Sequence, residues 1–300
     1  MIGANLSEPI KMAKLIGDRC RGERSPDFVL TALVRGHSRV TDDCPGPAKN
    51  GISVRRSAPL VSCIMPTYNR RDFIPVALEC FLAQDYINRE LLVVDDGEDA
   101  VGDLLEGQPG VRYLRLKERT SIGIKRNIAC GVARGEVILH WDDDDWFGRQ
   151  RLSRQVEPIL CREADITGLM CDCVLLLPSG ECWALTPELH RSMFVGNVHG
   201  ATLAFRRALW LKNLRYPDVS LAEDADFLRG ALARGMRLKR LRNGGLFIHV
   251  RHGRNARRFE AGRFGDPAGW LRIPEPSAEA KQAARAYRAC AGGQRAGPPP

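Results

Sequence analysis

Residues 59–97 read PLVSCIMPTYNRRDFIPVALECFLAQDYINRELLVVDDG, and this stretch decides the fold. The apolar run LVSCIM has the length and composition of a buried strand, and the polar turn PTYNRRD follows it. From Ile74 to Leu82 the apolar residues recur every three or four positions, which predicts an amphipathic helix. A second apolar run, ELLVV, then ends in DDG at residues 95–97. This order predicts a parallel β-α-β unit.

The same alternation continues through the next fifty residues. VRYLRL at 111–116 predicts a strand, SIGIKRNIACGVARG at 121–135 a helix closed by Gly135, and EVILHW at 136–141 another strand. Sheets of this kind bind ligands at the carboxyl ends of their strands. Three of the predicted strands end in PTYN, DDG and DDDD. We therefore expect an α/β protein with a mainly parallel nucleotide-binding sheet, helices on its faces and the site at that edge.

The rest of the chain suggests a division into three parts. Residues 1–58 are expected to form an extension with short helices. Residues 59–273 are expected to form one domain, with a nucleotide-binding half at 59–146 and a mixed α/β half at 147–273 that contains a helix over LAEDADFLRGALARG. Residues 274–300 are rich in Ala, Arg, Gly and Pro, so we expect a disordered tail that does not pack.

Composition limits the classes of function. The formal net charge is +9, but the basic runs lack the interleaved aromatic residues of a single-strand binding surface, so no direct contact with nucleic acid is expected.

The N-terminus does not resemble a secretion signal, and no apolar run is long enough to span a bilayer. We expect a cytoplasmic protein with reduced cysteines, and peripheral contact with an anionic membrane stays open. The C-x-C spacing at Cys171 and Cys173 is a poor zinc signature.

Four consecutive aspartates, Asp142 to Asp145, follow the last predicted strand. Two unit charges about 4 Å apart repel by roughly 4 kcal/mol at an effective dielectric constant of about 20, so a bound cation would stabilise the cluster. Oxygen ligands together with phosphate and water suit Mg²⁺ or Mn²⁺. The structural alternative is a solvated acidic turn.

Two further turns have side chains that suit a nucleotide. Carboxylates at Asp95 and Asp96 can accept hydrogen bonds from a ribose or a base, although either one could merely close its turn. The PTYN turn offers an aromatic face and an amide to a nucleobase. The first strand-to-helix turn has no glycine-rich fingerprint, and the sequence contains no G-x-x-x-x-G-K-[ST] motif, which argues against a dinucleotide fold and a P-loop.

The motifs LVSCIMPTYNR, ELLVVDDG, RNIACGVARGEVILHWDDDDW and EDADF together resemble those of the family 2 inverting glycosyltransferases with the GT-A fold. The resemblance covers residues 59–255. It implies transfer of a sugar from a nucleotide-diphospho-sugar, preferably UDP-linked, to a carbohydrate or other hydroxyl acceptor. It also implies assistance by Mn²⁺ or Mg²⁺.

The resemblance also implies roles for individual residues. Asp224 would be the general base, and Glu223 would position the substrate or the helix. The cation would be held by Asp144, Asp142 and His252, with His249 as an alternative histidine. The nucleotide-sugar would be bound by Pro66, Thr67, Tyr68, Asn69, Asp95, Asp96, Arg126, Asp142 and Asp143.

Some assignments stay open at the level of sequence. Asp145 allows a second register of the D-x-D element, Arg251 and Arg254 could contact the diphosphate, and residues 199–205 could line the acceptor pocket or form a core strand. The alternative functions are those of a nucleotidyltransferase acting on a sugar phosphate, a phosphatase and a non-catalytic nucleotide-sugar-binding protein. The donor sugar, the acceptor, the linkage and the oligomeric state are not specified by the sequence.

Overall fold

The structure, a computed structural model, describes residues 58–256 and 259–292. Apart from Ala58, the predicted N-terminal extension lies outside the described residues, as do residues 293–300. The described residues from Pro59 onward belong to one compact unit. Within them, no helix combines the length and the apolar composition needed to cross a membrane.

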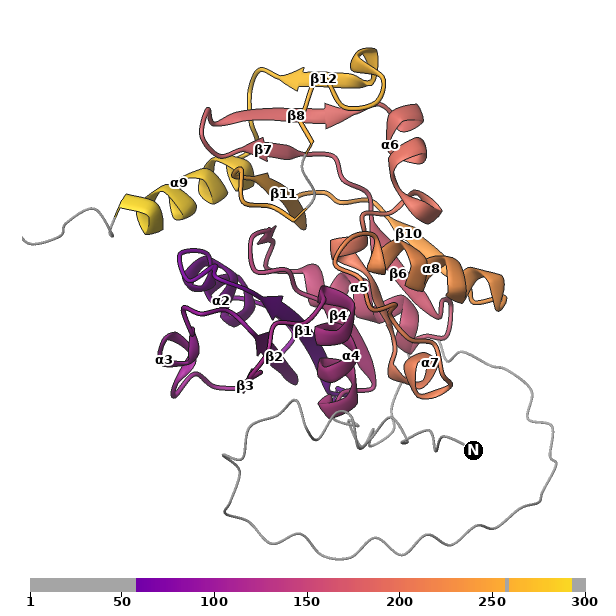
Figure 1. Cartoon of the computed structure of the whole chain (residues 1–300). Coiled ribbons are helices and arrows are strands. Elements are labelled where there is room, and N and C mark those ends of the chain that lie inside the picture. Colours follow the sequence, from indigo (N-terminus) through magenta and orange to yellow (C-terminus); the bar gives the residue numbers. More distant parts are fainter. Residues whose placement is uncertain (1–57, 257–258, 293–300) are drawn as a thin grey trace, which may run out of the picture. The chain divides into compact units, whose positions relative to one another are not determined.

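A seven-stranded sheet forms the centre of this unit (Figure 1). All neighbouring strands are parallel except β9, which is antiparallel to both of its neighbours. The predicted strands are thereby confirmed. In spatial order the strands are β10 (Leu238–Leu241), β6 (Ile166–Leu169), β9 (Ala204–Arg206), β4 (Val137–His140), β1 (Val61–Thr67), β2 (Arg89–Asp95) and β3 (Val111–Arg115).

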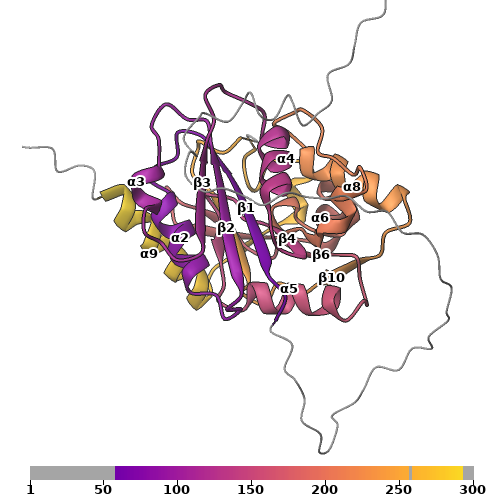
Figure 2. The same cartoon turned by 90° about the horizontal axis from the view of Figure 1, so that it is seen from below.

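Helices cover both faces of this sheet, because the alternating residues of each strand are buried on opposite sides. Cys63 and Leu91 pack on the side of α2 (Ile74–Leu82) and α5 (Arg151–Leu160). Ile64 and Leu92 pack on the side of α4 (Ile122–Val132) and α8 (Glu223–Ala233). Figure 2 shows α2 and α4 on opposite sides of the strands. Two short helices lie on these two sides as well: Leu105 of α3 (Gly102–Leu105) packs on the side of α2, and Trp210 of α7 (Arg207–Leu211) packs on the side of α4.

A second sheet of five strands contributes to the other half of the unit. Its order is β12 (Trp270–Ile273), β8 (Glu181–Leu185), β7 (Val174–Leu176), β11 (Phe247–Arg251) and β5 (Trp146–Phe147). Three short helical segments, α6 (Pro187–Met193), η1 (Val195–Asn197) and η2 (Gly200–Thr202), lead from β8 to β9 of the first sheet, and η3 (Pro267–Gly269) lies between β11 and β12. Because β5 follows the four aspartates directly, its pairing with β11 connects them to the second sheet.

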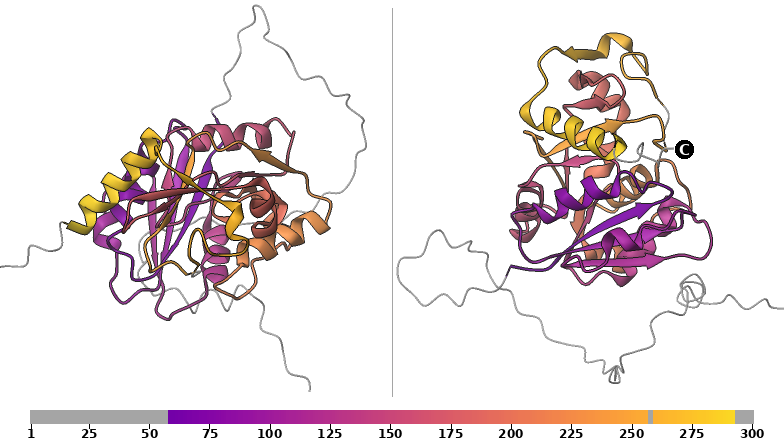
Figure 3. Two further views of the ribbon diagram at one scale, coloured as in Figure 1. Left: turned by 90° about the horizontal axis from the view of Figure 1, so that it is seen from above. Right: turned by 90° about the vertical axis from the view of Figure 1, so that its left-hand side faces the viewer.

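The C-terminal segment corrects the sequence prediction. Residues Ala278–Gly292, expected to be part of a disordered tail, form the helix α9 (Figure 3). Ala280, Ala283 and Tyr287 recur at helical spacing and are buried, and the Tyr287 ring lies 5.6 Å from the ring of Phe73. The composition did not reveal these buried positions, since alanine-rich segments can form a close-packed helix face as well as a low-complexity tail.

The end of α4 also differs from the expectation. The helix stops at Val132 and has Ala133 at its C-cap, so Gly135 does not close it. The backbone N–H of Gly135 instead donates to Ser62 Oγ at 2.8 Å. A Cβ at this position would lie only 2.7 Å from Ser62 N, so the glycine is required by close contact with β1.

Candidate functional site

The carboxyl ends of β1 and β4 and the first turn of α8 open onto one cavity of about 880 Å³. The β-sheet register explains this meeting, because Ile64 of β1 lies opposite His140 of β4 and the chain leaves both strands at the same edge. The structure therefore brings together residues that are far apart in sequence. The predicted site residues that line the cavity are Pro66, Thr67, Tyr68, Asn69, Arg126, Asp142, Asp143, Asp144, Glu223 and Asp224.

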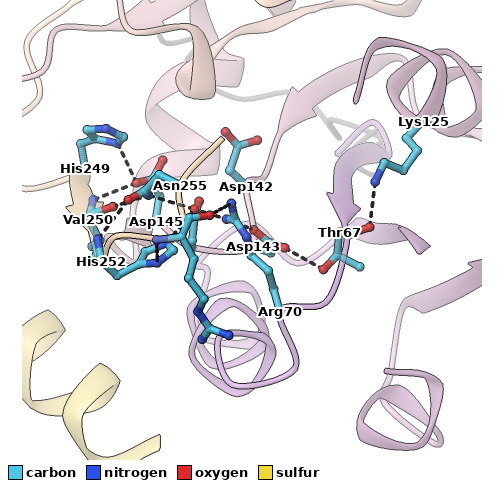
Figure 4. Close-up of polar contacts among 12 residues, drawn as sticks. Thr67, Arg70, Lys125, Asp142, Asp143, Asp145, His249, Val250, His252 and Asn255 are labelled. Carbon is cyan, nitrogen blue, oxygen red and sulfur yellow. Dashed lines mark hydrogen bonds and ion pairs between the residues drawn. The ribbon is translucent and has the colours of Figure 1, made fainter. Parts of the chain in front are cut away.

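Asp143 and Asp144 share the guanidinium group of Arg70 (Figure 4). Arg70 Nη1 lies 3.0 Å from Asp143 Oδ1 and also contacts Asp144 Oδ2. Thr67 Oγ1 donates to the other oxygen of Asp143 at 2.6 Å. Burial raises the pKa of Asp143 to about 7 in spite of Arg70. Both carboxylates face the cavity, as predicted, but each already has a cationic partner within the chain.

Asp144 receives two further hydrogen bonds. His252 Nε2 donates at 3.0 Å and Asn255 Nδ2 at 3.1 Å, both to Asp144 Oδ2. The N–H of Arg254 donates to His252 Nδ1, so Nε2 of this ring carries the proton. Burial alone would raise the pKa of Asp144, but Arg70 and His252 outweigh it and hold the pKa below its usual range. His252 does not line the cavity itself and reaches it through Asp144.

Asp145 also lines the cavity, but its carboxylate is bound to β11. One of its oxygens, Oδ1, accepts from His249 Nδ1 at 3.0 Å and from the backbone N–H of Val250 at 2.9 Å. Its side chain is 2% exposed, whereas that of Asp142 is 25% exposed. Asp145 thus ties the end of β4 to β11, and Asp142 is the more exposed of the two carboxylates.

Arg126 joins the aspartate run to α8. Its Nη2 donates to Asp142 at 2.8 Å and its Nε to Glu223 at 3.2 Å. Among the described residues, Nη1 of Arg126 is buried and has no hydrogen-bond acceptor. A buried N–H without an acceptor costs roughly 1–3 kcal/mol, so an oxygen atom of a bound ligand would relieve this cost.

Asp224 has a different environment from the other carboxylates. Among the described residues it forms no ion pair, and its Oδ1 accepts from the backbone N–H of Ala225 at 2.7 Å. Burial raises the pKa of Asp224 above its usual value, and Arg126 opposes this effect. Ala222, at the N-cap of α8, has a left-handed backbone with φ of 61°, which is unfavourable for alanine. Such strain is often found next to functional residues.

Asp95 and Asp96, both predicted to bind the nucleotide, do not line the cavity. Asp95 is fully buried and accepts from Gly97 N, Val101 N and Tyr113 Oη at 2.8, 3.2 and 2.8 Å. Asp95 closes the turn after β2, and both of its carboxylate oxygens already accept hydrogen bonds from the protein. Asp96 has a fully buried carboxylate, to which Lys125 Nζ donates at 2.6 Å.

The PTYN turn presents its side chains to the cavity. The guanidinium of Arg119 lies 4.3 Å from the centre of the Tyr68 ring, and Lys125 Nζ lies 5.8 Å from it. Asn69 has a left-handed backbone, and its Oδ1 accepts from Asp99 N at 3.2 Å. A Cβ at Gly97 would lie 2.5 Å from Asn69 N, which explains the glycine of the DDG motif. Tyr68 therefore offers an aromatic face with positive charge around it.

The other end of the cavity is formed by the second half of the unit. In the segment 199–205, His199, Gly200 and Ala201 line the cavity, whereas residues 203–205 are buried in the core. One part of this segment therefore faces the cavity, and the other part belongs to the core. Arg251 and Arg254 also line the cavity. Their guanidinium groups lie 4.1 Å and 5.0 Å from the rings of Phe259 and Phe73.

The types of side chain at Asp144 suit a divalent cation, but their arrangement does not preform a site. Among the described residues, no group of three or more His, Cys, Asp or Glu side chains is placed to hold a metal ion. The single guanidinium of Arg70 pairs with both Asp143 and Asp144, and His252 carries its proton on the nitrogen that faces Asp144. A cation at Asp144 therefore has to replace Arg70 as its partner. The described cysteines, including Cys171, are free thiols.

Three residues of this site were not predicted. Arg70 follows Asn69 directly and Lys125 precedes Arg126, so their positions within the quoted motifs were a usable signal. Lys125 also donates to the carbonyl of Thr67 at 2.9 Å and thereby fixes the turn after β1. Asn255 gave no signal, because only the folded chain places it beside Asp144.

Comparison with known proteins identifies related sequences. Residues 62–173 match the family described as "Glycosyl transferase family 2". The succinoglycan biosynthesis protein ExoO of Rhizobium meliloti is 30% identical over 216 residues, which cover 65% of this chain and 62% of that protein. The Escherichia coli protein WfaP, named a UDP-Glc:alpha-D-GlcNAc-diphosphoundecaprenol beta-1,3-glucosyltransferase, is 32% identical over 32% of this chain and 40% of its own. The chain thus spans less than two thirds of the length of these relatives.

Solved structures share the fold. TarS of S. aureus, residues 1–349 in complex with UDP, superimposes with a TM-score of 0.53 and 22% identity over 64% of this chain and 60% of that chain. The mannosyltransferase PcManGT of Pyrobaculum calidifontis, in complex with GDP-Man and Mn²⁺, gives a TM-score of 0.52 and 21% identity over 64% and 56% of the two chains. Residues 62–173 therefore match glycosyl transferase family 2, as the motifs predicted, and the described chain has the GT-A fold of glycosyltransferases.

Proposed function

We propose that the protein is an inverting glycosyltransferase. It transfers a sugar from a nucleotide-diphospho-sugar to the hydroxyl group of an acceptor, with a divalent cation as cofactor. The observation that carries this proposal is the meeting, in one cavity, of the aspartates after β4 with Asp224 at the start of α8. Arg126 holds the two sides together through Asp142 and Glu223.

The end of the cavity beside β1 is the donor site. Tyr68 supplies an aromatic face for the nucleobase, and Thr67 holds Asp143 in place next to it. Arg70 and Arg126 present guanidinium groups, which match the geometry of phosphate oxygens. UDP is the preferred nucleotide, because one TarS structure contains UDP and the name of WfaP specifies UDP-glucose.

Asp224 acts as the general base. Inversion requires a carboxylate that takes the proton of the acceptor hydroxyl while this oxygen attacks the anomeric carbon from the face opposite the leaving diphosphate. Asp224 faces the cavity without an ion-pair partner among the described residues, and its raised pKa makes it a better proton acceptor than an ordinary aspartate. Glu223 is bound to Arg126 and positions the first turn of α8.

Asp144, Asp142 and His252 are the residues that would hold Mn²⁺ or Mg²⁺. Such a cation, when bound, offsets the negative charge that develops on the leaving diphosphate. With such a cation bound at Asp144, Arg70 would be available to contact the phosphate oxygens. The presence of Mn²⁺ in the PcManGT structure supports a divalent cation as cofactor.

A donor screen with the purified chain tests the proposal. The protein is incubated with UDP- and GDP-linked sugars and a mixture of hydroxyl acceptors, with and without Mn²⁺, and the released nucleotide diphosphate is measured. We expect release from one donor that depends on the acceptor and increases with Mn²⁺. If no donor yields a nucleotide diphosphate, and calorimetry detects no binding of UDP or GDP, the proposal is refuted. Binding without release would indicate a non-catalytic nucleotide-sugar-binding protein.

A further inference from the structure

The carboxylate of Asp224 lies directly on the backbone of Gly200. A Cβ atom built at Gly200 would lie 1.5 Å from Asp224 Oδ2, 2.3 Å from its Cγ and 3.0 Å from its Cβ. Side chains do not approach a Cβ below about 3 Å, so any residue other than glycine at this position must displace the carboxylate. The position of Asp224 in the cavity thus depends on the absence of a side chain at residue 200.

Gly200 is itself held in place from the opposite side. His140 Nδ1 lies 2.8 Å from the carbonyl oxygen of Gly200, and His140 Nε2 lies 2.7 Å from the hydroxyl of Tyr216. A carbonyl oxygen can only accept, so Nδ1 carries the proton and Nε2 accepts from Tyr216. His140 is fully buried and is the last residue of β4, two positions before Asp142. The strand that delivers the aspartates therefore also fixes Gly200.

Tyr216 connects the same network to α8. Its ring stacks on Phe227 of α8 with a centroid distance of 4.3 Å and an interplanar angle of 12°. Its backbone is fixed by Asn127 of α4, whose Nδ2 donates to the carbonyl of Tyr216 at 2.8 Å and whose Oδ1 accepts from its N–H at 3.1 Å. One buried network thus fixes both the backbone of Gly200 beneath Asp224, through His140, and the helix that carries Asp224, through Tyr216.

We propose that Gly200, held by His140 and Tyr216, is a positioning residue that sets the distance between the general base and the donor site. This inference rests on the proposed role of Asp224. A network with a purely structural role would stabilise the loop but would not require a bare backbone under this carboxylate. Displacement of a catalytic group by about 1 Å can lower a rate by roughly 100-fold, so the contact is expected to have a large effect on turnover.

The substitution Gly200→Ala tests the proposal with the full chain. We expect kcat to fall about 100-fold, while the KM for the donor and the affinity for UDP stay within about twofold of wild type. A crystal structure of the variant should show the Asp224 carboxylate displaced. The control is Gly230→Ala, on α8, the helix that also carries Asp224. Its new Cβ would meet only Leu214 Cδ1 at 3.2 Å, the end of a flexible side chain, and we expect wild-type turnover.

A double-mutant cycle separates this inference from the proposed function. If Gly200 acts through Asp224, then adding Gly200→Ala to Asp224→Asn should cause no further loss in single-turnover rate. Additive losses, or wild-type turnover by Gly200→Ala, would overturn the inference while the role of Asp224 stands. Wild-type turnover by Asp224→Asn would instead refute the role of Asp224 itself.

A milder variant covers the case in which Gly200→Ala does not fold. Tyr216→Phe keeps the ring stacked on Phe227 and removes only the hydroxyl that donates to His140. We expect a loss in kcat of about five- to tenfold with unchanged affinity for UDP. An unchanged kcat in this variant would contradict the proposed support of Gly200 by His140.

Discussion

Replacing Arg70 by glutamine should make the stability of the protein depend on Mn²⁺. The Arg70 side chain is 15% exposed, and its Nη1 lies 3.0 Å from Asp143 and also contacts Asp144. At an effective dielectric constant of about 20, one such contact corresponds to roughly 5 kcal/mol of Coulomb attraction. Loss of one partner from a buried ion pair lowers the free energy of unfolding by about 3–5 kcal/mol, because the remaining carboxylates stay buried without their guanidinium partner.

Mn²⁺ should restore much of this loss. A cation at one hundred times its dissociation constant stabilises the folded protein by about 2.7 kcal/mol, and in the Arg70→Gln variant no guanidinium competes for Asp144. The wild-type protein should gain less, since the cation must first displace Arg70. The assay is urea unfolding at pH 7 with and without Mn²⁺.

Arg71→Gln is the matched control. Arg71 is the next residue along the chain and pairs with Asp103, whose side chain is 62% exposed, so its loss should change the stability by less than about 1 kcal/mol. The reasoning is refuted if Arg70→Gln is as stable as Arg71→Gln in metal-free buffer. It is also refuted if Mn²⁺ stabilises the wild-type protein as much as the Arg70→Gln variant.

Three further predictions concern α8, the β1–β2 pair and the pH profile. Ala222→Gly should raise the free energy of unfolding by up to about 1 kcal/mol, because glycine adopts the left-handed backbone without strain; equal or lower stability in urea would contradict this. Glu90→Gln should lower the free energy of unfolding by about 1–3 kcal/mol above pH 5. Burial would raise the pKa of Glu90, but hydrogen bonds from Ser62 and Arg134 outweigh it and lower the pKa, so the loss should vanish as the pH falls through this lowered value; a pH-independent difference would be inconsistent. On the acid side, kcat/KM should begin to fall at a pH above 3.8, the usual aspartate pKa, because burial raises the pKa of Asp224 and a general base must be deprotonated. A fall only at or below pH 3.8 would exclude Asp224 as the base.

The sheet and its main helices could be predicted because their signals are local. Apolar runs bounded by polar turns predicted β1, β2, β3 and β4, and the three-and-four spacing predicted α2, α4 and α8. The edge that carries the site followed from the order of these elements, since parallel strands deliver their carboxyl ends to one side. These are properties of short windows of sequence.

The hydrogen-bond partners of the carboxylates could not be predicted in the same way. Asp95 and Asp142 both follow an apolar strand, but Asp95 is enclosed by groups such as Tyr113, whereas Asp142 remains open to the cavity. These neighbours come from distant parts of the chain. The contact of Gly200 with Asp224 and its hydrogen bond with His140, 60 residues away, have the same origin.

The role of Asp224 is tested most directly by comparing transfer and binding in Asp224→Asn. Asparagine keeps the size and the hydrogen bond with Ala225 but cannot accept a proton. We predict that the variant binds UDP with wild-type affinity in calorimetry and that its rate of sugar transfer falls by about 100- to 10,000-fold. Transfer at the wild-type rate, or loss of UDP binding together with transfer, would contradict the account.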